Sequence, residues 1–93
     1  MKSEFVIDLK GVRTARSLHA RLKAALPLPE GYGRNYDAWH DVLTEYGPNW
    51  RLVFENAATV PATFRTVCAD AAEETPGLEI VFAPTPAVRR AKK

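Results

Sequence analysis

Acidic side chains recur near the middle of the chain at the spacing of one helical turn. Asp37, Asp41 and Glu45 are each four residues apart, and residues at this spacing lie on one face of a helix. A carboxylate has two acceptor oxygens, so it can bind an arginine cluster as a phosphate would. The chemistry that this pattern predicts is recognition of a basic site on another protein.

An ordinary solvated helix face is the alternative interpretation of these carboxylates, but three features favour a binding surface. Like charges at this spacing repel mildly, so they do not stabilise the helix. Proline and glycine stiffen the preceding segment 27–35, and a preorganised surface loses little entropy when it binds. Side chains typical of protein interfaces lie among the acids, namely Tyr32, Asn35, Tyr36, His40 and Tyr46.

Catalysis and metal binding find little support in the sequence. It contains no nucleophile elbow, phosphate-binding loop or dinucleotide-binding motif, and no HExxH or Cys/His cluster. A small hydrolase that uses Asp37, His40 and Asp41 is therefore the weakest alternative. Cys68 occupies an apolar helix position and is expected in the core. We expect no catalytic residue, no metal site and no cofactor.

The composition is typical of one globular domain. The chain has 93 residues, of which 46% are hydrophobic and 26% are charged. No apolar run approaches the roughly 20 residues of a membrane span, and the first residues do not form a signal peptide. A single cysteine fits a reducing compartment. We expect a cytoplasmic protein that is a monomer when free.

The formal net charge of +2 hides a partition along the chain. Residues 1–26 and 85–93 are basic, whereas residues 27–84 carry three Arg and nine acidic side chains. This leaves open a second function, a small nucleic-acid-binding module that uses residues 10–23 and the C-terminal tail. Such a module would bind RNA with a steep salt dependence, whereas a protein inhibitor would hardly bind RNA at all.

Hydrophobic periodicity predicts three strands and three long helices in the order β-α-α-β-α-β. The long helical connections imply parallel strands. We expect an α/β fold in which a small three-stranded parallel sheet is covered by about three helices, in three layers. Residues 1–84 form the expected domain, and residues 85–93 a flexible basic tail. The expected strands are 4–9, 50–55 and 78–82. The expected helices are 15–26, 36–46 and a third that begins at residue 61 or 64 and ends at residue 74.

The segment before the second helix is expected to hold that helix in place. Gly31 and Gly33 permit backbone angles that are closed to other residues. Asn35 is a good N-cap, and the helix dipole favours Asp37 in the first turn. The spacing of the apolar side chains predicts that the opposite face is buried through Trp39, Val42, Leu43 and Tyr46.

The motif L-P-x-x-Y-G-x-N-x-D-A-x-x-D, which runs from Leu28 to Asp41, resembles the barstar family of intracellular ribonuclease inhibitors. The expected order of strands and helices matches the same family. The resemblance implies that the loop and the second helix insert into the active site of a ribonuclease. It implies that Asp41 takes the place of the substrate phosphate, that Asp37 makes a second charged contact and that Tyr32 packs on the enzyme.

The resemblance assigns further roles beside these. Gly33 matches a loop glycine, Asn35 the helix cap and Thr44 a hydrogen-bonding position at the rim. Asp70 or Glu74, late in the third helix, corresponds to an additional acidic contact. The partner that the resemblance implies is a cognate ribonuclease or another toxin domain, so the protein would act as an antitoxin or immunity protein.

The sequence departs from the family pattern at Gly31, Tyr36, His40 and Glu45, which leaves the identity of that partner open. The predicted partner-binding surface combines the residues found from spacing with those found from the resemblance. Its members are Tyr32, Gly33, Asn35, Tyr36, Asp37, His40, Asp41, Thr44, Glu45 and Tyr46.

Overall fold

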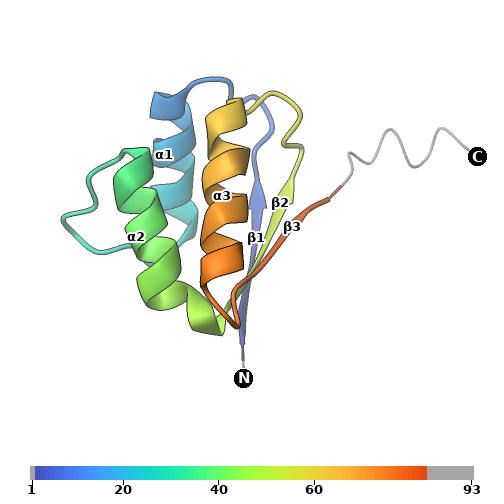
Figure 1. The fold of residues 1–93 in the computed structure, drawn as a ribbon. Coiled ribbons are helices and arrows are strands. Elements are labelled where there is room, and N and C mark those ends of the chain that lie inside the picture. Colours follow the sequence, from blue (N-terminus) through green and yellow to red (C-terminus); the bar gives the residue numbers. More distant parts are fainter. Residues whose placement is uncertain (1, 84–93) are drawn as a thin grey trace, which may run out of the picture.

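The computed structural model describes residues 2–83, which form one parallel sheet and three α-helices (Figure 1). This confirms the predicted α/β fold with its three-stranded sheet. The tail predicted at 85–93 lies outside the described residues. The elements in chain order are β1 (Ser3–Asp8), α1 (Ala15–Ala25), α2 (Tyr36–Tyr46), the 3-10 turn η1 (Gly47–Asn49), β2 (Trp50–Glu55), α3 (Ala62–Glu74) and β3 (Glu79–Phe82).

All three strands run parallel, with β2 in the centre of the sheet. The register places Ile7 beside Phe54 and Phe54 beside Phe82. α1 and α2 connect β1 to β2, and α3 connects β2 to β3. Figure 1 shows the three helices on one side of the sheet, with α2 farthest from it. α1 and α3 contact the sheet, whereas α2 packs on α3.

Four aromatic side chains connect the sheet to α2 through α3. Phe64 of α3 packs edge-on against Phe54 of β2 and Phe82 of β3, with ring centroids 5.2 and 6.1 Å apart. Phe64 also stacks on Trp39 of α2, with ring centroids 6.0 Å apart. Full burial of a phenylalanine contributes about 1.5–3 kcal/mol. Trp39, Phe54 and Phe64 are fully buried, so this row of rings fixes how α2 faces the rest of the molecule.

No helix among residues 2–83 is long and apolar enough to cross a membrane.

One predicted placement in the helices is wrong. Tyr46 was expected in the buried stripe but is 42% exposed, because α2 ends there and the ring stacks on Trp50 at the end of the core. The third helix, expected to begin at residue 61 or 64, begins at Ala62, and Pro61 is its N-cap residue.

The turn between α3 and β3 generates a first prediction. Gly77 has a φ of +94°, and a Cβ atom at this position would lie 2.6 Å from the carbonyl oxygen of Pro48 in η1. We expect Gly77→Ala to lower the free energy of unfolding by about 1–3 kcal/mol, because the backbone conformation and the contact both exclude a side chain. Urea unfolding measures this loss.

The matched control is Gly31→Ala. A Cβ atom at Gly31 would have no atom within 4 Å, and its φ is not left-handed. Its unfolding free energy should stay the same or rise slightly, because alanine restricts the unfolded chain more than glycine does. Equal losses in the two variants would contradict the packing of the turn at Gly77 against η1.

Candidate protein-binding site on the second helix

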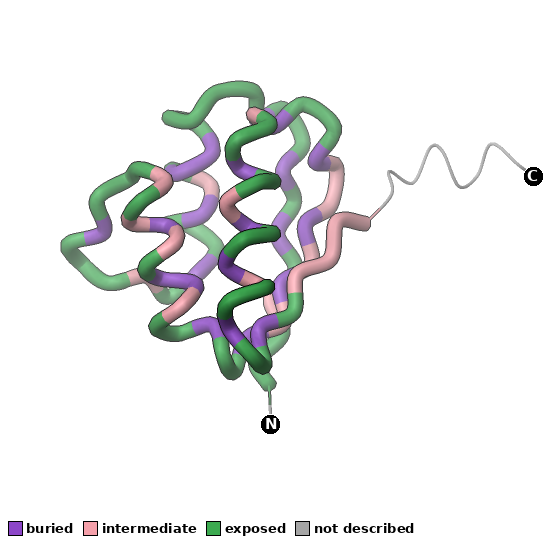
Figure 2. Tube along the Cα trace, in the orientation of Figure 1, coloured by how far each residue is buried: buried purple, intermediate pink, exposed green. Residues whose placement is uncertain are grey.

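The carboxylates of α2 lie on its exposed face. Asp37, Asp41 and Glu45 are all exposed, as their spacing predicted. The opposite face is buried through Trp39, Val42 and Leu43, which have exposed fractions of 0%, 4% and 0%. Figure 2 shows buried and exposed residues alternating around this helix. The carboxylates are therefore carried by a helix whose other side is fixed in the core.

Asn35 fixes where α2 begins, as the sequence predicted. Its side-chain oxygen accepts a hydrogen bond of 2.7 Å from the backbone N–H of Ala38. Asp37 lies in the first turn, where the unpaired N–H groups favour a negative charge. Gly33 is close by, since a Cβ atom there would lie 3.3 Å from Nδ2 of Asn35 and 3.4 Å from Cβ of Ala38. A small residue at Gly33 thus leaves room for the cap.

The prediction that Gly31 and Gly33 adopt angles closed to other residues is wrong. Neither glycine has a positive φ, and the residue of the loop that does is Arg34, with a φ of 59°. The left-handed turn therefore falls one residue after Gly33, immediately before the capping Asn35. Gly33 is needed for its close approach to the cap rather than for its backbone angles.

A buried hydrogen bond holds the loop onto α1. The hydroxyl of Tyr32 lies 2.6 Å from Nδ1 of His19, and the two residues are only 7% and 2% exposed. The ring of His19 also lies 5.3 Å from the ring of Tyr36, at the start of α2. Burial raises the pKa values of both tyrosines. One side chain of α1 thus contacts both ends of the segment that leads into α2.

Tyr32 and His19 differ from what sequence reasoning assigned to them. Tyr32 was predicted to meet the partner, but its side chain is buried, so in this structure it supports the loop from beneath. Sequence reasoning gave His19 no role, although its position in the helix indicated that the side chain is buried. It lies three residues before Leu22 and next to Leu18, within the apolar stripe of α1, and both leucines are fully buried.

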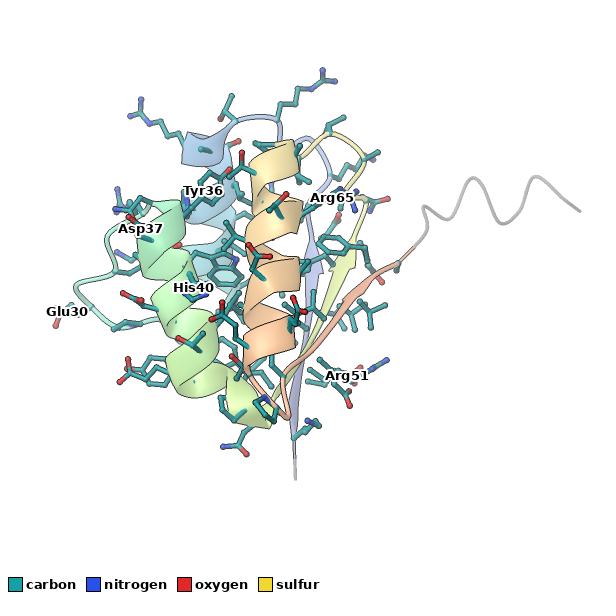
Figure 3. All side chains as sticks on the ribbon, viewed as in Figure 1. Glu30, Tyr36, Asp37, His40, Arg51 and Arg65 are labelled. Atoms are coloured by element: carbon teal, nitrogen blue, oxygen red, sulfur yellow. The ribbon has the colours of Figure 1, made fainter. Side chains whose placement is uncertain are left out.

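The acidic surface continues from α2 onto α3. Nε2 of His40 lies 3.2 Å from Oε1 of Glu74, and the two side chains are 34% and 58% exposed. Asp70 is exposed one turn before Glu74 on the same helix. Figure 3 shows His40 and Asp37 on α2, and Glu30 out on the loop. His40 thus links the exposed face of α2 to the Glu74 carboxylate of α3.

The remaining predicted residues lie along the same helix. Thr44 is half-buried, and its hydroxyl donates a hydrogen bond of 3.1 Å to the backbone carbonyl of Asp41. Tyr36 is half-buried, whereas Tyr46 is exposed at the far end. Among residues 2–83, no group of three His, Cys, Asp or Glu side chains could hold a metal ion.

A family model described as barstar, the barnase inhibitor, matches residues 3–84, which include every element of the sheet and all the residues of α2. The chain belongs to the Barstar family. A comparison with curated proteins gave no match. Barstar-family membership supports, at the level of the family, a ribonuclease-inhibitor-like role rather than an enzymatic one, with a protein as partner.

The buried His19 generates a pH prediction. Burial lowers the pKa of His19, so the folded chain binds a proton at this residue less readily than the unfolded chain, whose histidines titrate near pH 6.5. The free energy of unfolding should therefore fall as the pH drops below about 6.5, by at most about 1.4 kcal/mol per pH unit. Urea unfolding between pH 8 and pH 5 measures the slope.

Two variants isolate this effect. The double variant His19→Leu/Tyr32→Phe removes both members of the hydrogen bond and should flatten the profile between pH 7 and pH 5. His40→Gln removes the other histidine of the chain and should leave the slope in place. A slope that disappears with His40→Gln and survives in the double variant would assign the acid sensitivity to the surface instead of the loop anchor.

Proposed function

We propose that this protein inhibits a cognate ribonuclease by covering its basic active site with the loop and helix of residues 33–46. The observation that carries the proposal is the exposed row of Asp37, Asp41 and Glu45 on a helix whose opposite face is fully buried. Membership of the Barstar family supports a ribonuclease as the partner. As an antitoxin or immunity protein, the chain would act without performing catalysis itself.

Asp41 is the proposed centre of this surface. It lies one turn from Asp37 and one turn from Glu45, so it has a carboxylate on each side along the helix. The backbone at Asp41 is fixed by the Thr44 hydroxyl and by burial of the neighbouring Val42. A ribonuclease binds phosphate with cationic side chains, and the two oxygens of Asp41 offer those side chains the same acceptor geometry.

The proposed contact surface keeps nine of the ten predicted residues. Tyr32 serves as a positioning residue, since its buried hydroxyl holds the loop to His19. Glu74 joins the surface through its contact with His40, with Asp70 one turn away. The nine contact residues are Gly33, Asn35, Tyr36, Asp37, His40, Asp41, Thr44, Glu45 and Tyr46.

The contribution of Asp41 generates a binding prediction. Asp41→Ala should weaken binding to the ribonuclease by about 2–5 kcal/mol, because it leaves the partner's cationic groups buried without a counter-charge. The matched control is Glu30→Ala, an exposed acid at the edge of the loop, which should cost less than about 1 kcal/mol. Calorimetric titration against barnase, the enzyme named in the family description, is the first measurement.

If barnase does not bind, the Asp41→Ala variant also serves to identify a different partner. Wild-type protein and Asp41→Ala serve as parallel baits in cell extract, and the cognate ribonuclease should be captured by the first and lost from the second. The unfolding free energies of both variants should match that of the wild type, since both side chains are exposed. Equal, small losses of affinity for Asp41→Ala and Glu30→Ala would show that the site is misplaced.

Electrostatic attraction generates a kinetic prediction. An acidic surface that approaches a basic active site is steered by long-range charge, and salt screens this attraction. The association rate should fall as salt is raised, while the dissociation rate changes much less. Stopped-flow association in a salt series measures both. Association rates that stay flat across the series would contradict a charge-complementary interface.

A further inference from the structure

One face of the parallel sheet has no cover within residues 2–83. All three helices lie on the other side, although parallel sheets are normally covered on both faces (Figure 1). The middle of the open face is a row of three valines in register, Val6, Val53 and Val81. Val6 is 57% exposed, which makes it the most exposed large aliphatic side chain that the structure describes.

Charged side chains border the valine row on one side. Arg51 lies between Glu4 and Glu79 in register, with distances of 3.1 Å from Nε to Glu4 Oε2 and 3.2 Å from Nη1 to Glu79 Oε1. Lys2 approaches Glu79 at 4.0 Å. Figure 3 shows Arg51 on the side of the sheet away from the helices. The charges at this end of the open face are therefore largely balanced.

The opposite border of the valine row is acidic. Asp8 and Glu55 lie side by side in register, and neither forms a salt bridge with any of residues 2–83. Oδ1 of Asp8 accepts hydrogen bonds from Asn56 and from the backbone N–H of Lys10, and the guanidinium of Arg21 lies near its backbone carbonyl. Among residues 2–83, the Glu55 carboxylate has no such hydrogen-bonding partner and no counter-charge.

The chain itself supplies a segment of matching chemistry at this border. The backbone N–H of Ala83 donates a hydrogen bond of 2.9 Å to the carbonyl of Phe54, so the last described residue lies close to Glu55. The segment that follows, residues 84–93, lies outside the described residues and contains Val88, four basic side chains and no acid. Ten residues span up to about 33 Å, and a six-residue strand is about 20 Å long. The segment can therefore reach every part of the open face.

We propose that residues 84–93 turn back over the open face of the sheet, with Val88 against the valine row and the basic side chains against the acids of Asp8 and Glu55. Proline at 84 and 86 ends the pairing of β3 and favours such a change of direction. A second copy of the chain fits less well, because three strands offer roughly 300 Å², whereas a stable interface needs about 800 Å² from each partner.

A spin label on the full-length chain tests this placement. Ala91→Cys provides the attachment site, and Cys68 is fully buried, so it stays unlabelled in the folded protein. In the NMR spectrum, the methyl signals of Val6, Val53 and Val81 should lose most of their intensity. The methyl signals of Leu18 and Leu22, on the helix side, should keep theirs.

Charge variants show whether the acids hold the segment. Glu55→Gln combined with Asp8→Asn should restore much of the lost valine intensity, whereas the control Glu73→Gln, an exposed acid on α3, should restore none. Raising the salt from 0.1 to 1 M, which shortens the screening length from about 10 to about 3 Å, should act like the double variant.

Three results would overturn the proposal. The valine signals could lose no more intensity than those of the leucines, which would leave the face open. The loss of valine signal intensity could be the same in the Glu55→Gln/Asp8→Asn variant, which would show that these acids do not hold the segment. The loss could also appear between labelled and unlabelled molecules in a mixed sample, which would assign the cover to a second copy.

Discussion

The burial of Trp39 is the constraint on which the rest of the molecule depends. Its ring stacks on Phe64, which in turn packs on Phe54 and Phe82 of the sheet, so a continuous row of aromatic rings runs from the strands to α2. Each residue turns an α-helix by about 100°. A shift of α2 by one residue would therefore expose this ring and carry a carboxylate toward the core. The orientation of the acidic face is thus a consequence of core packing.

A second contact fixes the loop before α2, and the fold keeps two possible binding surfaces apart. The buried pair of His19 and Tyr32 ties to α1 the loop that leads to Asn35. Figure 1 shows α2 farthest from the sheet, with α3 between them, and the open face of the sheet lies on the other side of the strands. A partner bound to α2 would leave the valine row free, so the two surfaces can be tested independently.

Much of the fold and part of the site follow from the sequence, for identifiable physical reasons. The bounds of α2 and β2 were predicted to the residue, because Asn35, Gly47 and Pro48 are strong local signals for where a helix begins and ends. The role of His19 was missed, since a polar residue in an apolar stripe gives no indication of its distant partner. The buried position of Tyr32 was missed for the same reason, because its hydrogen bond links residues 13 positions apart. The left-handed Arg34 also escaped prediction, since local rules favour the adjacent glycine.

The central claim is that a ribonuclease is bound by the exposed face of α2, and a chemical-shift map tests it most directly. Isotope-labelled protein is titrated with a barnase-type ribonuclease, and the shift of each backbone amide is recorded. The account predicts that the largest shifts fall within residues 33–46 and extend to Glu74, while the amides of α1 barely move. Shifts that concentrate on the basic residues 10–23, or that leave 33–46 unchanged, would contradict it.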